Sequence, residues 1–187
     1  MQFRLVYRER LKGGNSKDAP HIHEVRRSFH SQLEVLWKQP PLSGNSTMLN
    51  RDQPLGGICV LESVGAFTFA PLVTTKLRLH AELDILFLRP APPGEVVRHG
   101  GDLDNRIKTL IDCLRIPMEN EIPRGDTPRE DENPFFCLLQ DDKLVSAFSV
   151  TSDRLLTPDA HEQDVEIVIT VRTRATQGTL GNLSISV

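Results

Sequence analysis

The sequence lacks a long apolar run, which excludes a membrane-spanning helix from its organisation. No window of the 187 residues approaches the ~18 uninterrupted apolar residues that such a helix needs. The first residues carry charge where a secretory signal peptide needs an apolar core. We therefore expect a protein that has no membrane partner and stays in the cytoplasm of the cell that makes it.

Cysteine is also scarce, and its spacing excludes a structural zinc site. Cys59, Cys113 and Cys137 form no C-x-x-C pair and no cluster with histidine at zinc-ligand spacing. We expect reduced and mostly buried thiols. The chain has no internal repeat, and its length is typical of one domain, which we predict over residues 1–187.

The net charge of −3 argues against a nucleic-acid partner, because phosphate binding depends on Lys and Arg. The distribution of charge along the chain weakens this argument. Residues 119–132 hold six acids and two arginines, so the rest of the chain has 20 basic and 19 acidic residues. Residues 1–38 carry eight basic side chains and four acids, which indicates a weak phosphate-facing surface.

The apolar pattern predicts an α+β fold, with a mixed β-sheet and two main helices in β-α-β-α-β-β order. The helices are expected over residues 23–37 and 104–114. The first of them leaves Arg26, Arg27 and His30 on or beside its polar face. Strands are expected over residues 2–7, 58–61, 76–79 and 81–90, over the run FFCLLQDDKLVSAFSV, and over DVEIVITVRTR.

Three segments lack such a pattern. Residues 40–57 are rich in Pro, Gly, Ser and Asn and predict a polar connection. Residues 117–134 are acidic and contain prolines, which is typical of an insertion loop. Residues 175–187 are expected to form a loosely held tail.

The segment GDLDNRIKTLIDCL places two carboxylates, Asp102 and Asp104, where a Gly-rich turn enters a helix. If the chain is extended there, both can point into one cleft, and Asp141-Asp142 on a later strand would complete a carboxylate cup. Such oxygen ligands suit Mg²⁺, which keeps positions open for phosphate oxygens. Metal held in this way can activate water for attack on a phosphodiester.

Lys108 and Asp112 follow Asp104 at intervals of four residues, so the three share one flank of the predicted helix. An ammonium beside a metal can hold the scissile phosphate or stabilise its developing charge.

Each of these residues also has an ordinary structural interpretation. Asp104 or Asp102 could cap the helix, Asp141-Asp142 could form a turn, and Lys108 with Asp112 could be a surface ion pair worth ~0.3–0.5 kcal/mol. An EF-hand is excluded, because Arg106 and Ile107 stand where an oxygen ligand and a glycine are needed. A phosphoaspartate enzyme is excluded because its first Asp directly follows an apolar strand, whereas a Gly-rich turn precedes Asp102 here.

The two motifs together resemble the RusA-type Holliday junction resolvases. That family has D-L-D-N-x-x-K-x-x-x-D-x-L and a later D-D-x-x-V, which match residues 102–114 and 141–145. The resemblance covers residues 81–173 well and residues 1–38 loosely. Its flanking elements agree: a strand before the first motif, a helix through it, and two strands after the second.

The resemblance implies a function. It implies a Mg²⁺-dependent endodeoxyribonuclease, with Mn²⁺ as an alternative ion and no organic cofactor. Its metal ligands would be Asp102, Asp104 and Asp142, and its essential lysine would be Lys108. The supporting motif positions are Asn105, Asp112 and Asp141. The family acts as a homodimer that nicks opposing strands of a four-way DNA junction symmetrically, in DNA recombination and repair, and its genes are often carried by phages and prophages.

This chain departs from the family before the first motif, where basic residues give way to His99-Gly100-Gly101. Candidate DNA contacts elsewhere are Arg8, Arg10, Lys12, Lys17, Arg26, Arg27, Arg98 and Arg106. Three alternatives stay open: a nuclease for flaps or forks, a junction-binding protein without turnover, and a partner-binding module whose acidic loop mimics DNA. The acidic loop could instead repel DNA, clamp a partner subunit, or limit which DNA enters.

Overall fold

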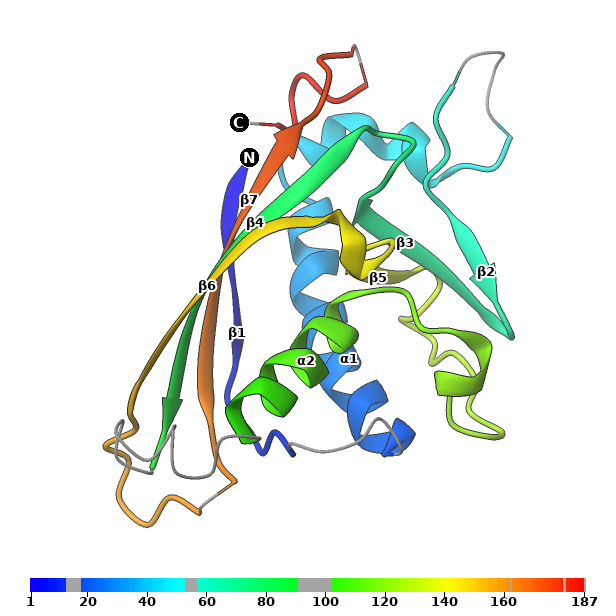
Figure 1. Ribbon diagram of the computed structural model, residues 1–187. Coiled ribbons are helices and arrows are strands. Elements are labelled where there is room, and N and C mark those ends of the chain that lie inside the picture. Colours follow the sequence, from blue (N-terminus) through cyan, green and yellow to red (C-terminus); the bar gives the residue numbers. More distant parts are fainter. Residues whose placement is uncertain (13–17, 53–56, 91–101, 162, 180, 187) are drawn as a thin grey trace.

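A four-stranded mixed sheet forms one side of the molecule (Figure 1). The computed structural model describes the backbone of Asp102 and, in full, residues 1–12, 18–52, 57–90, 103–161, 163–179 and 181–186. The sheet order is β1 (Gln2–Tyr7), β7 (Glu166–Ala175), β4 (Leu79–Arg89) and β6 (Val145–Arg154). Within this sheet β4 and β6 are parallel and the other two pairs are antiparallel, and β6 lies at an edge.

Alternating side chains give this sheet one buried face. In β4, Leu83 and Ile85 are buried, while Glu82 and Asp84, which alternate with them, are half-exposed. The same period of two runs along β7, as a half-buried strand requires. The buried face is therefore the one on which the helices pack.

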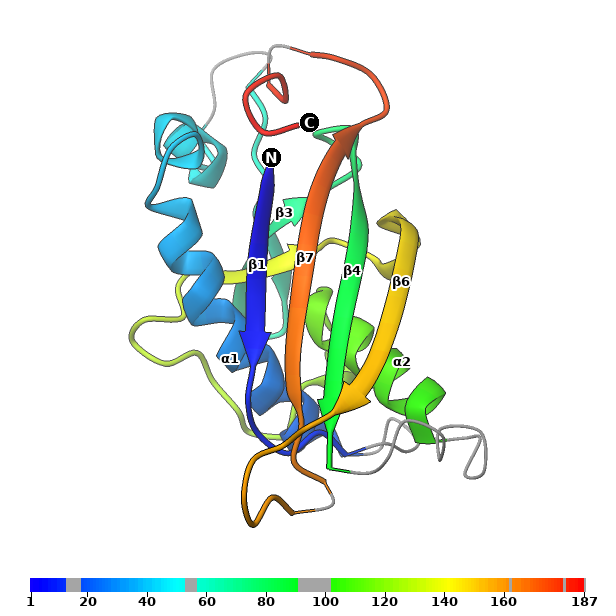
Figure 2. The ribbon, with the colours of Figure 1, turned by 90° about the vertical axis from the view of Figure 1, so that its left-hand side faces the viewer.

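Two α-helices lie on that face, α1 (Ala19–Trp37) and α2 (Asp102–Leu114) (Figures 1 and 2). The Asp18 side chain caps α1 by accepting a hydrogen bond from the backbone N–H of His21 at 3.3 Å. Val25, Phe29 and Leu33 follow at helical spacing and are buried. This stripe orients α1 toward the core.

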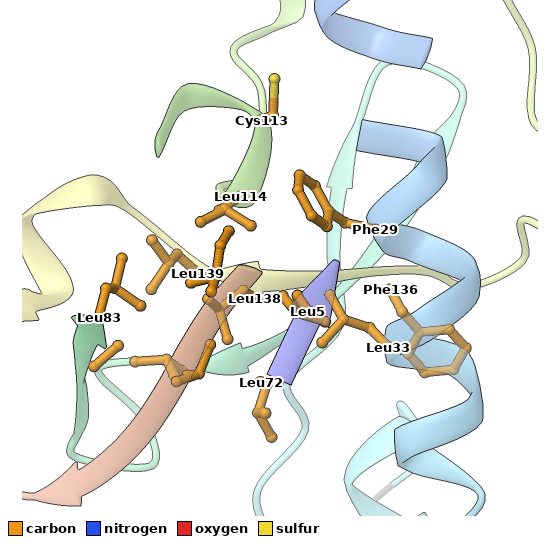
Figure 3. Close-up of a cluster of buried hydrophobic side chains, with 14 of the residues drawn as sticks. Leu5, Phe29, Leu33, Leu72, Leu83, Cys113, Leu114, Phe136, Leu138 and Leu139 are labelled. Atoms are coloured by element: carbon orange, nitrogen blue, oxygen red, sulfur yellow. The ribbon is translucent and has the colours of Figure 1, made fainter. Parts of the chain in front are cut away.

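A second sheet of three strands lies beyond the helices, in the order β2 (Glu62–Val64), β3 (Phe67–Val73) and β5 (Phe135–Leu139). All five residues of β5 are buried, and α1 packs directly against this strand. Figure 3 shows Leu5 of β1, Phe29 of α1, Leu114 of α2 and Leu138 of β5 converging in one core.

The predicted α+β class with a mixed sheet is confirmed, but the element order was incomplete. Residues 58–61 and 76–78 are not strands, and β2 and β3 were missed. Pro71 within β3 is a local signal against a central strand. Every residue from Phe67 to Val73 is buried apart from the half-exposed Thr68, and this burial outweighs the signal from Pro71.

The run FFCLLQDDKLVSAFSV was predicted as one strand, and this was wrong. It forms β5 and β6, which belong to different sheets. A short 3-10 helix, η4 (Asp142–Leu144), turns the chain between them. The turn places Asp142 at the junction of the two sheets.

The segments expected to lack structure are partly ordered. The polar connection contains the 3-10 helix η1 (Leu42–Leu49). The tail is not loose in its described part, because Asn182 and Ile185 are buried. The Asn182 amide donates to the Leu77 carbonyl at 2.8 Å, and Thr173 donates to the Ile185 carbonyl. The tail therefore closes one end of the core beside the N-terminus, where Figure 2 shows both chain ends.

Cys113 and Cys137 are buried, Cys59 is half-buried, and all three are free thiols, as expected. Over the described residues, neither α-helix is long and apolar enough to cross a membrane.

Candidate active site

A cavity of about 390 Å³ opens between α2 and the edge strand β6. It brings together residues from three separate parts of the chain: α2, η4 and β6. Its lining residues are Leu103, Asp104, Ile107, Lys108, Ile111, Asp112, Asp142, Phe148 and Val150.

The flank of α2 expected from the sequence faces this cavity. Asp104, Lys108 and Asp112 all line it, as their spacing of four residues predicts. Asp104 and Lys108 are exposed, and Asp112 is half-buried. The helix therefore presents two carboxylates and an ammonium on one side.

Asp142 enters the same cavity from the junction of β5 and β6. Its neighbour Asp141 performs the capping, because the Asp141 side chain accepts from the backbone N–H of Lys143 at 3.1 Å. Lys143 Nζ also lies 3.1 Å from Asp141 Oδ2. Partial burial opposes ionisation of Asp141, but these contacts with Lys143 prevail and lower its pKa. The Asp142 side chain lines the cavity.

Asp102 is the first residue of α2, so the extended backbone expected at Asp102 and Asp104 is wrong. Positions two apart on a helix do not share a face. Neither Asp104 nor Asp102 precedes the helix as its cap. The side chain of Asp102 lies outside the described residues.

The donor set suits a hard cation, since Asp104 and Asp142 offer carboxylate oxygens in one cavity. Mg²⁺ is commonly bound through one or two carboxylates, with waters and substrate phosphates completing its shell. The described side chains, which leave out that of Asp102, contain no group of three His, Cys, Asp or Glu that could hold a metal ion. Among the described side chains, Asp104 and Asp142 are thus the two carboxylates available to a cation in this cavity.

Asp112 forms an ion pair within the chain, with Arg115. Its Oδ1 lies 3.0 Å from Arg115 Nη2, and Arg115 also binds Glu121. Burial disfavours the charge on Arg115, but these carboxylates outweigh it and raise its pKa. The sequence left open a surface ion pair of Asp112 with Lys108; the ion pair of Asp112 is with Arg115, which reaches back one turn along the chain. Asp112 braces the end of α2.

Comparison of the chain with family models, with curated proteins and with solved structures finds no match in any of the three.

The basic residues proposed to contact DNA are mostly engaged elsewhere. Arg26 is 1% exposed and Arg106 6%, so predicting them as phosphate contacts was wrong. Arg26 instead donates to the backbone carbonyl of Asp112 at 3.0 Å. His30, also expected near the polar face, is buried and accepts from the Phe136 N–H at 2.8 Å. Both residues turn inward because α1 is covered by α2 and β5.

Four other candidates form ion pairs within the chain. Arg8 pairs with Glu166, Arg10 with Asp164, Lys12 with Asp18, and Arg27 with Glu24, Asp126 and Glu132. Lys17 and Arg98 lie outside the described residues. The supporting residue Asn105 is exposed and does not line the cavity.

Sequence reasoning missed Phe148, Val150 and Arg115 at this site. Phe148 and Val150 were assigned to the strand without a role, and their alternation was the available signal. Arg115 lay just beyond the predicted helix. A basic residue three positions after Asp112 on a helix is a recognisable partner for it.

Proposed function

We propose that this protein is a metal-dependent, structure-selective endodeoxyribonuclease that resolves four-way DNA junctions. The observation that carries the proposal is the meeting of Asp104 and Lys108 of α2 with Asp142 of η4 in one cavity. Asp142 is distant in sequence from Asp104 and Lys108, and it belongs to the second RusA-like motif while they belong to the first. The cation is Mg²⁺, with Mn²⁺ as an alternative.

The proposed ligands are Asp104 and Asp142, which line the cavity, together with Asp102, which only the family resemblance adds. A bound divalent cation would activate water and stabilise charge on the phosphodiester. Lys108 would hold a phosphate oxygen from the same flank of α2. Without a cation, two carboxylates facing this cavity would repel phosphate, so a pure DNA-binding role gains nothing from them.

The family resemblance adds the rest of the proposal. The protein acts as a homodimer on branched DNA in the cytoplasm, and it makes paired symmetric nicks in recombination or repair. A substrate panel of four-way junctions, flaps and forks distinguishes junction resolution from cleavage of other branched DNA.

Substitution of the carboxylates tests the proposal. Asp104→Asn and Asp142→Asn are each expected to reduce Mg²⁺-dependent cleavage of a synthetic four-way junction by at least ~10²-fold while junction binding persists. Asp102→Asn is expected to behave in the same way. Asp131→Asn is the control, because Asp131 is exposed in the acidic segment and does not line the cavity.

Two results would contradict the metal site. One is wild-type cleavage that continues in excess chelator. The other is undiminished cleavage by both Asp104→Asn and Asp142→Asn.

A further inference from the structure

Phe148 is an aromatic side chain on the inner face of the large sheet, yet it is 56% exposed. It pairs across the sheet with Leu83, and Val150 pairs with Ile85. Leu83 and Ile85 are buried beneath the helices. The inner face thus continues onto β6, where the described helices leave Phe148 uncovered.

Phe148 lines the cavity of the candidate active site. The apolar wall of this cavity consists of Leu103, Ile107, Ile111, Phe148 and Val150. Its charged rim consists of Asp104, Lys108, Asp112 and Asp142. At about 390 Å³ the cavity is within the ~300–1,000 Å³ typical of ligand sites. It exceeds what a hydrated cation needs.

A ligand for this cavity must combine an anionic group with a flat apolar one. The rim, with a cation bound and with Lys108, suits a phosphate. The wall, ending in an accessible aromatic ring, suits a nucleobase, because every base has a π-face that stacks on such rings. An apolar protein surface fits less well, because covering the wall would bury the adjacent carboxylates without partners.

We propose that the apolar wall receives one unstacked nucleobase of the DNA strand whose phosphate lies at the charged rim, with the base stacked on Phe148. This inference rests on the proposed nuclease function and specifies how the site selects its substrate. Extruding a base costs least where stacking is already interrupted. Branch points meet that condition, so the wall favours branched over continuous duplex DNA.

Fluorescence of 2-aminopurine tests this without cleavage. The base analogue is placed in turn at each position near the branch point of a four-way junction, with Ca²⁺ in place of Mg²⁺. We expect wild-type protein to raise the emission at one or two positions by several-fold. Phe148→Ala is expected to lose this increase, and Phe148→Tyr to retain it.

Leu86→Ala is the matched control, because Leu86 is an exposed apolar residue of β4 on the opposite face of the sheet. With Mg²⁺, Phe148→Ala is expected to slow junction cleavage about tenfold, with Phe148→Tyr close to wild type. Circular dichroism and thermal unfolding verify the fold of each variant.

The outcomes separate this inference from the proposed function. If wild type cleaves junctions and Phe148→Ala gives the same fluorescence and rate, the base site is wrong and the nuclease stands. If the fluorescence change depends on Phe148 but no DNA is cleaved, the base site stands and the nuclease is wrong. If Phe148→Ala converts a dimer to a monomer in analytical ultracentrifugation, the wall is covered by a second copy, and the inference is overturned.

Discussion

Each aspartate at this site, considered alone, could have an ordinary structural role such as capping a helix. The structure shows which of them have that role and which line the cavity. Asp104 is the third residue of α2 and not its cap. Asp141, not Asp142, caps η4. The side chains of Asp104 and Asp142 line the cavity instead. Asp104 and Asp142 were both singled out by the sequence pattern, and their role as metal ligands stays a prediction, whereas the extended backbone expected at Asp102 and Asp104 was wrong.

Lys108 offers the sharpest test at this scale. Lys108→Ala is expected to lower the turnover number for junction cleavage by ~10²-fold, because an ammonium that meets charge in the transition state is lost. The dissociation constant for the junction is expected to change by less than ~fivefold. Single-turnover cleavage and binding titrations measure the two quantities separately.

Lys38→Ala is the control for Lys108, since Lys38 is exposed at the end of α1 and pairs with Glu34. Equal losses of binding and turnover in Lys108→Ala would show that Lys108 acts only by holding DNA.

The helix α2 and the turn between β5 and β6 position the candidate site. The sequence predicts the first but not the second. The α2 stripe of Ile107 and Leu110 is helical in pattern and is buried as expected. The break between β5 and β6 has no comparable signal, because apolar residues continue on both sides of Asp141-Asp142. The apolar run divides into two strands because β5 pairs with β3 in one sheet and β6 pairs with β4 in the other.

The C-terminal tail is packed more tightly than its sequence predicts, and its contribution to the free energy of unfolding can be measured. Ile185 is 0% exposed, so Ile185→Ala is expected to reduce the free energy of unfolding by about 2–4 kcal/mol. Leu183→Ala, at a neighbouring position that is 64% exposed, is expected to change it by less than ~0.5 kcal/mol. Urea denaturation compares the two variants, and a similar loss in both would contradict the packed tail.

At the scale of the whole molecule, the acidic segment is tied to α1. Asp126 and Glu132 both bind Arg27, and Arg129 binds Glu24. Partial burial opposes ionisation of Asp126, but Arg27 outweighs it and lowers its pKa. These carboxylates are therefore partly neutralised within the chain. Their expected roles in repelling DNA or clamping a partner stay predictions.

His23 makes this packing sensitive to acid. Burial, together with Arg26 and Arg27, lowers the pKa of His23 to about 4 from 6.5. The unfolded chain therefore binds the proton first as the pH falls from about 6.5 to about 4. Stability from neutral His23 is fully present above pH 6.5. We expect up to about 3 kcal/mol of unfolding free energy to be lost across that window.

Urea denaturation at pH 7, 5.5 and 4.5 measures the effect. His23→Asn is expected to flatten the pH dependence in part, because burial also lowers the pKa of His30 and adds in the same direction. His161→Asn, at an exposed position, is the control. A wild-type slope in His23→Asn would contradict this role.

The amino-acid pattern alone predicts the α+β class, β1, most of both α-helices, and the flank of Asp104, Lys108 and Asp112. These features depend on periodicity, which neighbouring residues encode locally. Tertiary structure decided the rest. Arg26 turned inward because α2 and β5 cover α1, and the β5–β6 break followed strand pairing. Only packing of α2 beside β6 could place Asp104, Asp142 and Phe148 around one cavity.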